Sequence, residues 1–132
     1  MFAKIKHALR IVQHQVRAAT KGRSPHWSTC RKDFLKKYPT CAACGSKLRL
    51  DVHHVEPFHL DPAKELDTTN LITLCMSSLE CHFRLGHGGD YKAFNPLIRA
   101  DATSSLNATA NRAVIEKKAH DLRLYKVQGE GV

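Results

Sequence analysis

The alternation of apolar and polar residues predicts a short β-hairpin near the middle of the chain. Residues 47–55 alternate apolar with polar side chains, which is the period of a half-buried strand. Residues 71–74 form a second short apolar run. Because neighbouring side chains of a strand point to opposite faces, His53 and His54 should diverge, with His54 on the same side as Val52.

Apolar residues recur at helical spacing before this hairpin, at positions 2, 5, 9, 12 and 16. Steps of three and four residues place these side chains on one face of a helix. A second, shorter helix is expected over Cys30–Lys37, because Ser28 or Thr29 can cap its N-terminus. Its inward-facing residues are expected to be Phe34 and Leu35.

After the hairpin the pattern predicts two more helices. One should begin near Leu79 or Cys81, carry His82, and be stopped or kinked by the glycines at positions 86, 88 and 89. The other should cover Ser105–Tyr125, and its buried stripe is expected to be Leu106, Ala110, Ala113, Val114 and Leu122. A hairpin flanked by N- and C-terminal helices predicts the α+β fold class.

Length and composition predict one small domain. With 132 residues, 42% of them hydrophobic, the chain has a modest core that a bound metal would help to stabilise. No apolar run approaches the roughly 18 residues that a membrane span needs, and no secretory signal is recognised. The expected compartment is therefore the cytoplasm, and no membrane partner is expected.

The positive charge is concentrated in the first 37 residues. These residues hold ten Lys or Arg and one acid, whereas the other 95 hold eleven of each sign. Such clustering favours a polyanionic partner, with nucleic acid as the first candidate. The cations expected to contact DNA there are Lys4, Lys6, Arg10, Arg17, Lys21 and Arg23. The first helix itself is open to three interpretations: a helix packed on the core, a helix lying along DNA, or an organelle transit peptide.

Four of the five cysteines have the spacing of a structural zinc site. Cys41 and Cys44 form a C-x2-C pair, and Cys75 and Cys81 form a looser C-x5-C pair some thirty residues later. Two such local pairs can supply the corners of a tetrahedral Zn²⁺ site. The sequence therefore predicts a zinc clamp rather than disulfides, and leaves Cys30 as a buried or half-buried thiol.

Histidines near the hairpin point to metal-assisted hydrolysis. His53 and His54 are adjacent at the end of a predicted strand, so one can ligate a metal while the other faces a water molecule. Phosphodiester hydrolysis needs both functions, because a metal neutralises the phosphate charge and a base deprotonates the attacking water. Histidine suits the role of base because its ordinary pKa is about 6.5.

The motifs around these residues resemble the zinc-containing, phage-type branch of the HNH endonucleases. They cover roughly residues 24–96 and read Cys41-x-x-Cys44, Asp51-Val52-His53-His54-Val55-x-Pro57, Leu66-Asp67-x-x-Asn70-Leu71-Ile72-x-Leu74-Cys75 and Cys81-His82. The resemblance implies a ββα-metal core, also called a His-Me finger, in which a hairpin, a loop and a helix hold one divalent cation. It also implies a host cytoplasm as the compartment if the chain is phage-encoded.

The resemblance assigns roles by position. His54 would be the general base, His53 and His82 would be metal ligands, and Asn70 would brace the loop that orients His54. His87 is a further candidate ligand, with phosphate contact or helix capping as alternatives. It lies about 140° from His82 around an ideal helix, so both can face one ion only if Gly86 unwinds the turn. Arg84 could hold a phosphate, although an exposed arginine on a helix is commonly just solvated.

These observations predict a DNA endonuclease that uses structural Zn²⁺ together with catalytic Mg²⁺, Mn²⁺ or another divalent cation. The expected organisation is a basic arm over residues 1–23, the nuclease domain over 24–97 and a helical extension over 98–132. A noncatalytic, zinc-stabilised module that binds nucleic acid is the alternative. The sequence does not indicate the oligomeric state, the specificity, or whether one strand or both are cut.

Overall fold

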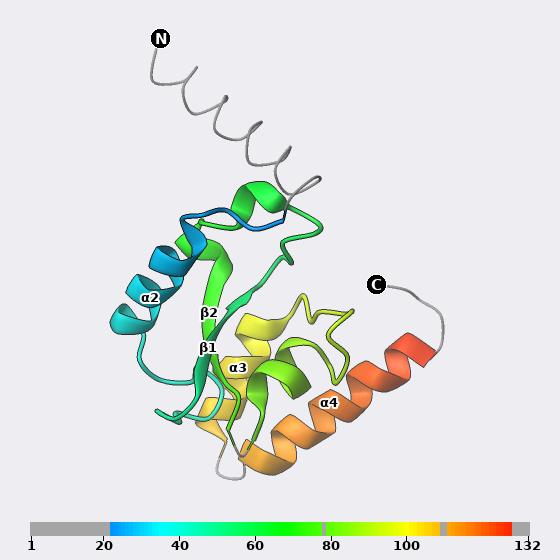
Figure 1. The fold of residues 1–132 in the computed structure, drawn as a ribbon. Helices are drawn as coiled ribbons and strands as arrows, with labels where there is room; N and C mark the ends of the chain where they lie inside the picture. Colours follow the sequence, from blue (N-terminus) through cyan, green and yellow to red (C-terminus); the bar gives the residue numbers. More distant parts are fainter. Residues whose placement is uncertain (1–21, 78, 109–110, 128–132) are drawn as a thin grey trace.

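The computed structural model describes residues 22–77, 79–108 and 111–127. The fold is α+β, built around a two-stranded antiparallel sheet with helices before and after it (Figure 1). The elements are α2 (Trp27–Lys37), β1 (Leu50–His54), β2 (Leu71–Cys75), a π-helical turn (His82–Gly86), α3 (Ile98–Asn107) and α4 (Asn111–Val127), with short 3-10 turns at Pro62–Lys64 and Thr68–Asn70. The predicted helix over residues 2–16, and with it Lys4, Lys6, Arg10, Arg17 and Lys21, lies outside the described residues.

The predicted hairpin is confirmed, with a shorter first strand than the alternation suggested. Leu50 pairs with Cys75 and His54 pairs with Leu71 in the antiparallel register. The strand does not extend back to residue 47, because Arg49 has a φ of 49°, which interrupts the extended backbone. Leu48, which should have faced the core, is 70% exposed.

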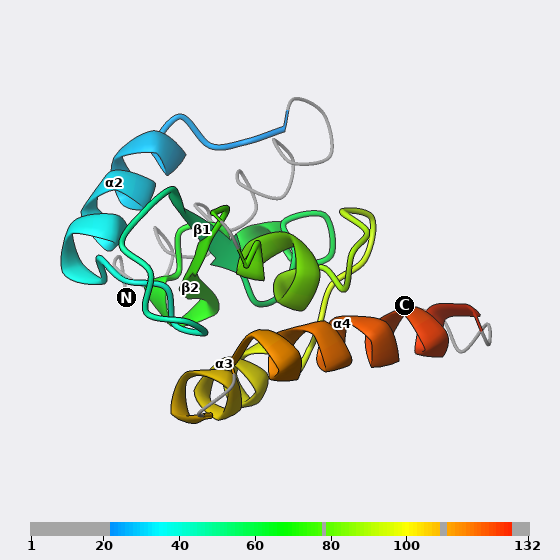
Figure 2. The same cartoon turned by 90° about the horizontal axis from the view of Figure 1, so that it is seen from below.

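The hairpin separates two hydrophobic clusters. The smaller one joins α2 to one face of the sheet through Phe34, Val52 and Leu71. The larger one holds the cysteines together with side chains from β2, the π turn and both C-terminal helices, including Leu74, Leu85, Ile98 and Ile115. Seen from below, α2 lies on one side of the hairpin, and α3 and α4 lie on the other (Figure 2). The strands are therefore covered from both sides, and His54, Leu71 and Cys75 at their ends are buried.

Helix α2 begins three residues earlier than predicted. Ser28 and Thr29 lie inside the helix, and His26 is the N-cap without a side-chain cap bond. A turn centred on Ser24 starts the helix instead: its hydroxyl accepts a bond from the His26 N–H, and its carbonyl accepts one from the Trp27 N–H. The Ser24 N–H in turn donates to the Glu65 carboxylate. A tertiary contact, which the local sequence does not reveal, therefore sets the start of the helix.

The prediction of one C-terminal helix was wrong, because the structure has two. The backbone of Ala108 is extended (ψ 140°), so α3 ends there and α4 starts a new helical phase. The predicted buried stripe assumed one continuous helix across this break. In the structure Leu106 and Ala113 of that stripe are exposed, whereas Ile115 and Ala119 are buried instead. Ala110 lies outside the described residues. None of the described helices combines the length and the apolar character needed to cross a membrane.

Candidate active site

The four predicted cysteines meet in one cluster. The sulfur atoms of Cys41, Cys44, Cys75 and Cys81 all lie within 4.8 Å of one another, and the Sγ atoms of Cys44 and Cys75 are 3.6 Å apart. A tetrahedral Zn²⁺ with Zn–S bonds of about 2.3 Å requires sulfur separations of about 3.8 Å. Cys41, Cys75 and Cys81 are almost fully buried. The distances and the donor set fit a closed structural zinc site.

The electrostatics of this cluster also favour a cation. Burial raises the pKa of the Cys44 thiol to about 12. The neighbouring sulfurs of Cys41 and Cys75, together with burial, raise the pKa of Cys81 as well. Four thiolates therefore cannot share this space by themselves, whereas a coordinated metal ion deprotonates thiols and neutralises their charge.

Three histidines form a second cluster next to the hairpin. One ring nitrogen from each of His53, His82 and His87 lies within 4.8 Å of those of the other two. His82 and His87 face each other because the segment between them is a π turn, in which the His87 N–H bonds to the His82 carbonyl five residues back. The wider π turn brings residues five apart onto one side, which an α-helix does not do. The sequence predicted that the turn must unwind, and the structure meets this requirement over the whole of His82–Gly86.

The ring nitrogens of His82 and His87 face each other. His87 Nδ1 lies 2.7 Å from the Ala93 carbonyl, which can only accept, so this nitrogen carries the proton. His82 Nδ1 faces the Asp51 carboxylate at 3.5 Å. With its proton on Nδ1, His87 has an acceptor at Nε2, and this atom lies 3.2 Å from Nε2 of His82. Two ring nitrogens this close share a proton or a cation.

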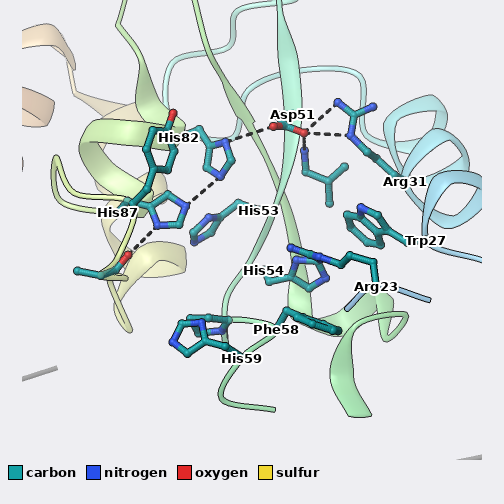
Figure 3. Close-up of a pocket in the computed structure, with 14 residues that line it drawn as sticks. Arg23, Trp27, Arg31, Asp51, His53, His54, Phe58, His59, His82 and His87 are labelled. Atoms are coloured by element: carbon teal, nitrogen blue, oxygen red, sulfur yellow. Dashed lines mark hydrogen bonds and ion pairs between the residues drawn. The ribbon is translucent and has the colours of Figure 1, made fainter. Parts of the chain in front are cut away.

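His53 completes the set from strand β1. Its ring centroid lies 5.0 Å from that of His82 and 4.8 Å from that of His87 (Figure 3). The side chain is 2% exposed, and Nε2 is buried without a hydrogen-bond partner among the described residues. Burial, reinforced by the two neighbouring histidines, lowers the pKa of His53 to about 2, so the ring is neutral. A neutral, buried imidazole with an unused nitrogen fits a metal ligand.

His54 points to the other face of the same strand, as the alternation predicted. Its ring stacks on Trp27 at a centroid distance of 4.5 Å (Figure 3). Its Nε2 lies 2.9 Å from the Glu65 carbonyl. Nε2 therefore carries the proton, and Nδ1 keeps its lone pair. Burial lowers the pKa of His54, the Glu65 carbonyl opposes this effect, and the cation of Arg23 adds to it. The ring is a neutral acceptor of protons near neutral pH.

Asn70 holds the loop that connects the two strands. Its Oδ1 accepts a bond from the Glu56 N–H at 2.9 Å, and its Nδ2 donates to the carbonyls of Glu56 (3.1 Å) and Lys64 (3.4 Å). The side chain is buried, so these bonds are protected from water. Glu65, whose carbonyl contacts His54, directly follows Lys64. Asn70 thus fixes both ends of the loop against which His54 packs.

The three-histidine cluster and His54 line one pocket of about 380 Å³. Arg23 lines it on the His54 side, where its guanidinium lies over the rings of Trp27 (5.4 Å) and Phe58 (4.7 Å). His59 lines it as well and is exposed. The pocket thus combines a three-histidine cluster, a separate neutral histidine and a partly exposed cation.

Comparison with known proteins agrees with this geometry. Residues 41–88 match the family model described as HNH endonuclease. This segment is therefore similar to an HNH endonuclease domain. Searches of curated proteins and of solved structures give no match. An HNH domain supports a nuclease-type function in general terms, and the matched residues include both cysteine pairs, Asn70 and all the histidines of the two faces.

Asp51 and Glu65 are residues of the matched segment that the sequence analysis did not single out. Asp51 touches both Arg31 and His82. Its position two residues before His53 was a usable signal, because residues two apart share a face of a strand. Glu65 is fully buried and accepts the Ser24 N–H with both carboxylate oxygens. No local pattern predicts that contact, since its partners are 41 residues apart.

Arg84 is not among the residues that line the pocket of about 380 Å³. Its guanidinium contacts Glu80 at 3.3 Å and Glu116 of α4 at 3.7 Å. That Arg84 holds a phosphate stays a prediction, and in the structure its charged partners are these two carboxylates. Arg84 links the π turn to the C-terminal helix.

Proposed function

We propose that the protein is a metal-dependent DNA endonuclease that hydrolyses phosphodiester bonds. The observation that carries this proposal is the division of the two adjacent histidines. His53 joins His82 and His87 on one side of β1, and His54 stands apart from them on the other side. Hydrolysis of a phosphodiester needs a metal and a base that reach one substrate without binding each other.

We assign the catalytic cation to His53, His82 and His87. Their facing Nε2 atoms and the unpartnered nitrogen of His53 support this assignment. When bound, a divalent cation neutralises charge on the phosphate and on the leaving oxygen. Imidazole ligands with open positions accept Mg²⁺ poorly and Mn²⁺, Ni²⁺ or Zn²⁺ more readily, so the cation is a matter for experiment.

We assign the general base to His54. Its low pKa keeps the ring neutral, and the bond to Glu65 leaves Nδ1 as the nitrogen that can accept a proton from water. Asn70 acts indirectly, because it holds the loop that carries the Glu65 carbonyl. The stacking on Trp27 restricts the ring further.

We assign Zn²⁺ to the four cysteines as a structural ion, and DNA contacts to the basic residues. Arg23 at the edge of the pocket is the described cation best placed to meet a phosphate. Its side chain is 48% exposed, two aromatic rings support the guanidinium, and its ion pair with Glu65 is long, at 3.9 Å. Lys4, Lys6, Arg10, Arg17 and Lys21 would extend this contact along the duplex. In this proposal residues 1–23 are a binding arm, 24–97 the nuclease and 98–132 a supporting extension.

A plasmid assay tests the proposed function. Supercoiled DNA is incubated with the protein in Mg²⁺, Mn²⁺ or Ni²⁺, with and without a chelator that removes the added cation. His54→Ala should lose most cleavage, by about 10²–10⁴ in rate, and should keep DNA and zinc binding. His120→Ala, in an exposed residue of α4, is the matched control and should cut like the parent. Binding without cleavage in every cation would favour the noncatalytic alternative, and an unchanged rate for His54→Ala would remove His54 from the mechanism.

A further inference from the structure

We propose that Asp51 and Arg31 are positioning residues that hold His82 with Nε2 directed toward His87 and His53. This inference rests on the proposed function, because it takes His82 to be a metal ligand. It adds a carboxylate and a guanidinium behind the histidine cluster, and the guanidinium comes from α2, outside the matched residues 41–88.

The contacts of Asp51 fix its carboxylate. One oxygen, Oδ1, accepts three bonds: from Arg31 Nε at 3.0 Å, from an Arg31 terminal nitrogen at 2.9 Å, and from the Val52 N–H at 2.8 Å. With Oδ1 fully used, the group has little freedom to rotate. The other oxygen, Oδ2, is left facing His82 Nδ1 at 3.5 Å. Figure 3 shows Asp51 between Arg31 and His82, with contacts to both.

The charge of Asp51 suits this role. The Arg31 guanidinium donates two bonds to Asp51 Oδ1 and keeps a positive charge beside the carboxylate, which favours its ionised form. An ionised carboxylate only accepts, so it favours the form of His82 that carries its proton on Nδ1. Nε2 is then free to act as a ligand.

His82 depends on Asp51 for this orientation. Its Nδ1 is buried and has no hydrogen-bond partner among the described residues, so the carboxylate at 3.5 Å is the polar group that faces it. His87 is anchored differently, through its Nδ1 and the Ala93 carbonyl. The two rings of the π turn therefore have separate anchors, and a change at Asp51 should affect His82 while leaving the anchor of His87 in place. Ligating histidines commonly use such carboxylate partners, and loss of the partner typically costs about 10–100-fold in metal affinity or activity.

Binding of Mn²⁺ tests the inference without any cleavage. The zinc-loaded protein is titrated with Mn²⁺, and free Mn²⁺ is measured by electron paramagnetic resonance. Asp51→Asn should weaken binding about 10–100-fold. Asp51→Glu should restore part of it, and Arg31→Gln should weaken it less than Asp51→Asn. The matched control is Asp121→Asn, which breaks the pair with Lys117 (2.7 Å) on α4, away from the pocket, and should bind Mn²⁺ like the parent.

A second measurement reports the orientation of His82 directly. The zinc-loaded protein is measured without Mn²⁺, in mildly alkaline buffer. Under these conditions long-range ¹H–¹⁵N spectra distinguish the two neutral forms of each imidazole. The His82 signals, identified by their loss in His82→Gln, should show the proton on Nδ1 in the parent and a mixture of forms in Asp51→Asn. If Asp51→Asn does not fold, Arg31→Gln decides, because a half-exposed arginine can be replaced without opening the core.

The outcomes separate this inference from the proposed function. If His82→Gln binds Mn²⁺ like the parent, His82 is not a ligand and the proposed metal site fails. If His82→Gln loses Mn²⁺ but Asp51→Asn and Arg31→Gln keep both the parent's affinity and its His82 form, the metal site stands and the positioning role is overturned.

Discussion

The cysteine cluster and the histidine cluster are both suited to a metal, yet they differ in how completely they would enclose the ion. The cysteine cluster offers four ligands, three of them almost fully buried, and none of the four lines the pocket. The histidine cluster offers three ligands and faces a pocket of about 380 Å³. A complete tetrahedral set stabilises a fold, whereas an incomplete set leaves positions for water and substrate. The number of ligands and their access to solvent thus distinguish the proposed structural site from the proposed catalytic one.

The largest effect on stability should come from removing one ligand of the cysteine cluster. Cys81→Ser removes a buried ligand that joins the π turn to the base of the hairpin, so zinc should be lost and the domain should unfold. Apparent binding energies of structural zinc reach about 10–16 kcal/mol, comparable to the whole stability of a small domain. Zinc content and thermal denaturation measure the change. Cys30→Ser is the control and should keep both, because Cys30 lies outside the cluster.

The next largest effect should come from removing one ligand of the histidine cluster. It should reduce cleavage and leave the fold intact. His82→Ala should abolish the response of cleavage to an added divalent cation while zinc content stays at the parent's level. The reason is that His82 is not one of the four residues of the cysteine cluster, and its side chain is only half-buried. Cleavage and zinc content are measured on the same preparation. Unfolding of His82→Ala together with activity of Cys81→Ser would reverse the assignment of the two clusters.

A smaller effect is expected at Gly86, which lies against His53 of the histidine cluster and Leu74 of the core. An added Cβ at Gly86 would lie 3.1 Å from His53 Cε1 and 3.3 Å from Leu74 Cδ1, tighter than ordinary contact. Gly86→Ala should therefore displace the His53 ring and cost about 1–3 kcal/mol of stability, the usual range for overpacking. Mn²⁺ affinity should fall while zinc is retained. Unchanged Mn²⁺ affinity would show that His53 has more room than its contacts indicate.

The smallest effect on either cluster should come from deleting residues 1–21, which carry five of the predicted DNA-contacting cations. Each lost phosphate contact should flatten the plot of log K against log salt by about 0.9. Turnover at saturating DNA should change little, because both clusters lie in the remaining chain. DNA binding is measured over a series of salt concentrations. The same slope with and without the arm would mean that the duplex is held elsewhere.

Local patterns were sufficient to predict the hairpin and the faces of its histidines. Strand alternation placed His53 and His54 on opposite sides, and paired spacings identified the four clustered cysteines, because both signals depend on neighbours in the sequence. The start of α2 and the brace behind His82 were not predicted. Both depend on contacts between residues far apart, Ser24 with Glu65 and Arg31 with Asp51. The phase of α4 was missed because one extended residue, Ala108, resets it.

The π turn makes the number of residues between His82 and His87 as important as their identity. In an α-helix, residues four apart share a face, so a pair separated by four needs no irregular turn. This chain has one residue more and absorbs it by widening the helix for a single turn. Removing any one residue between the two histidines would return the segment to ordinary helical spacing and rotate everything beyond it, including the loop that presents the Ala93 carbonyl. A one-residue deletion here would therefore be more damaging than most substitutions at the same positions.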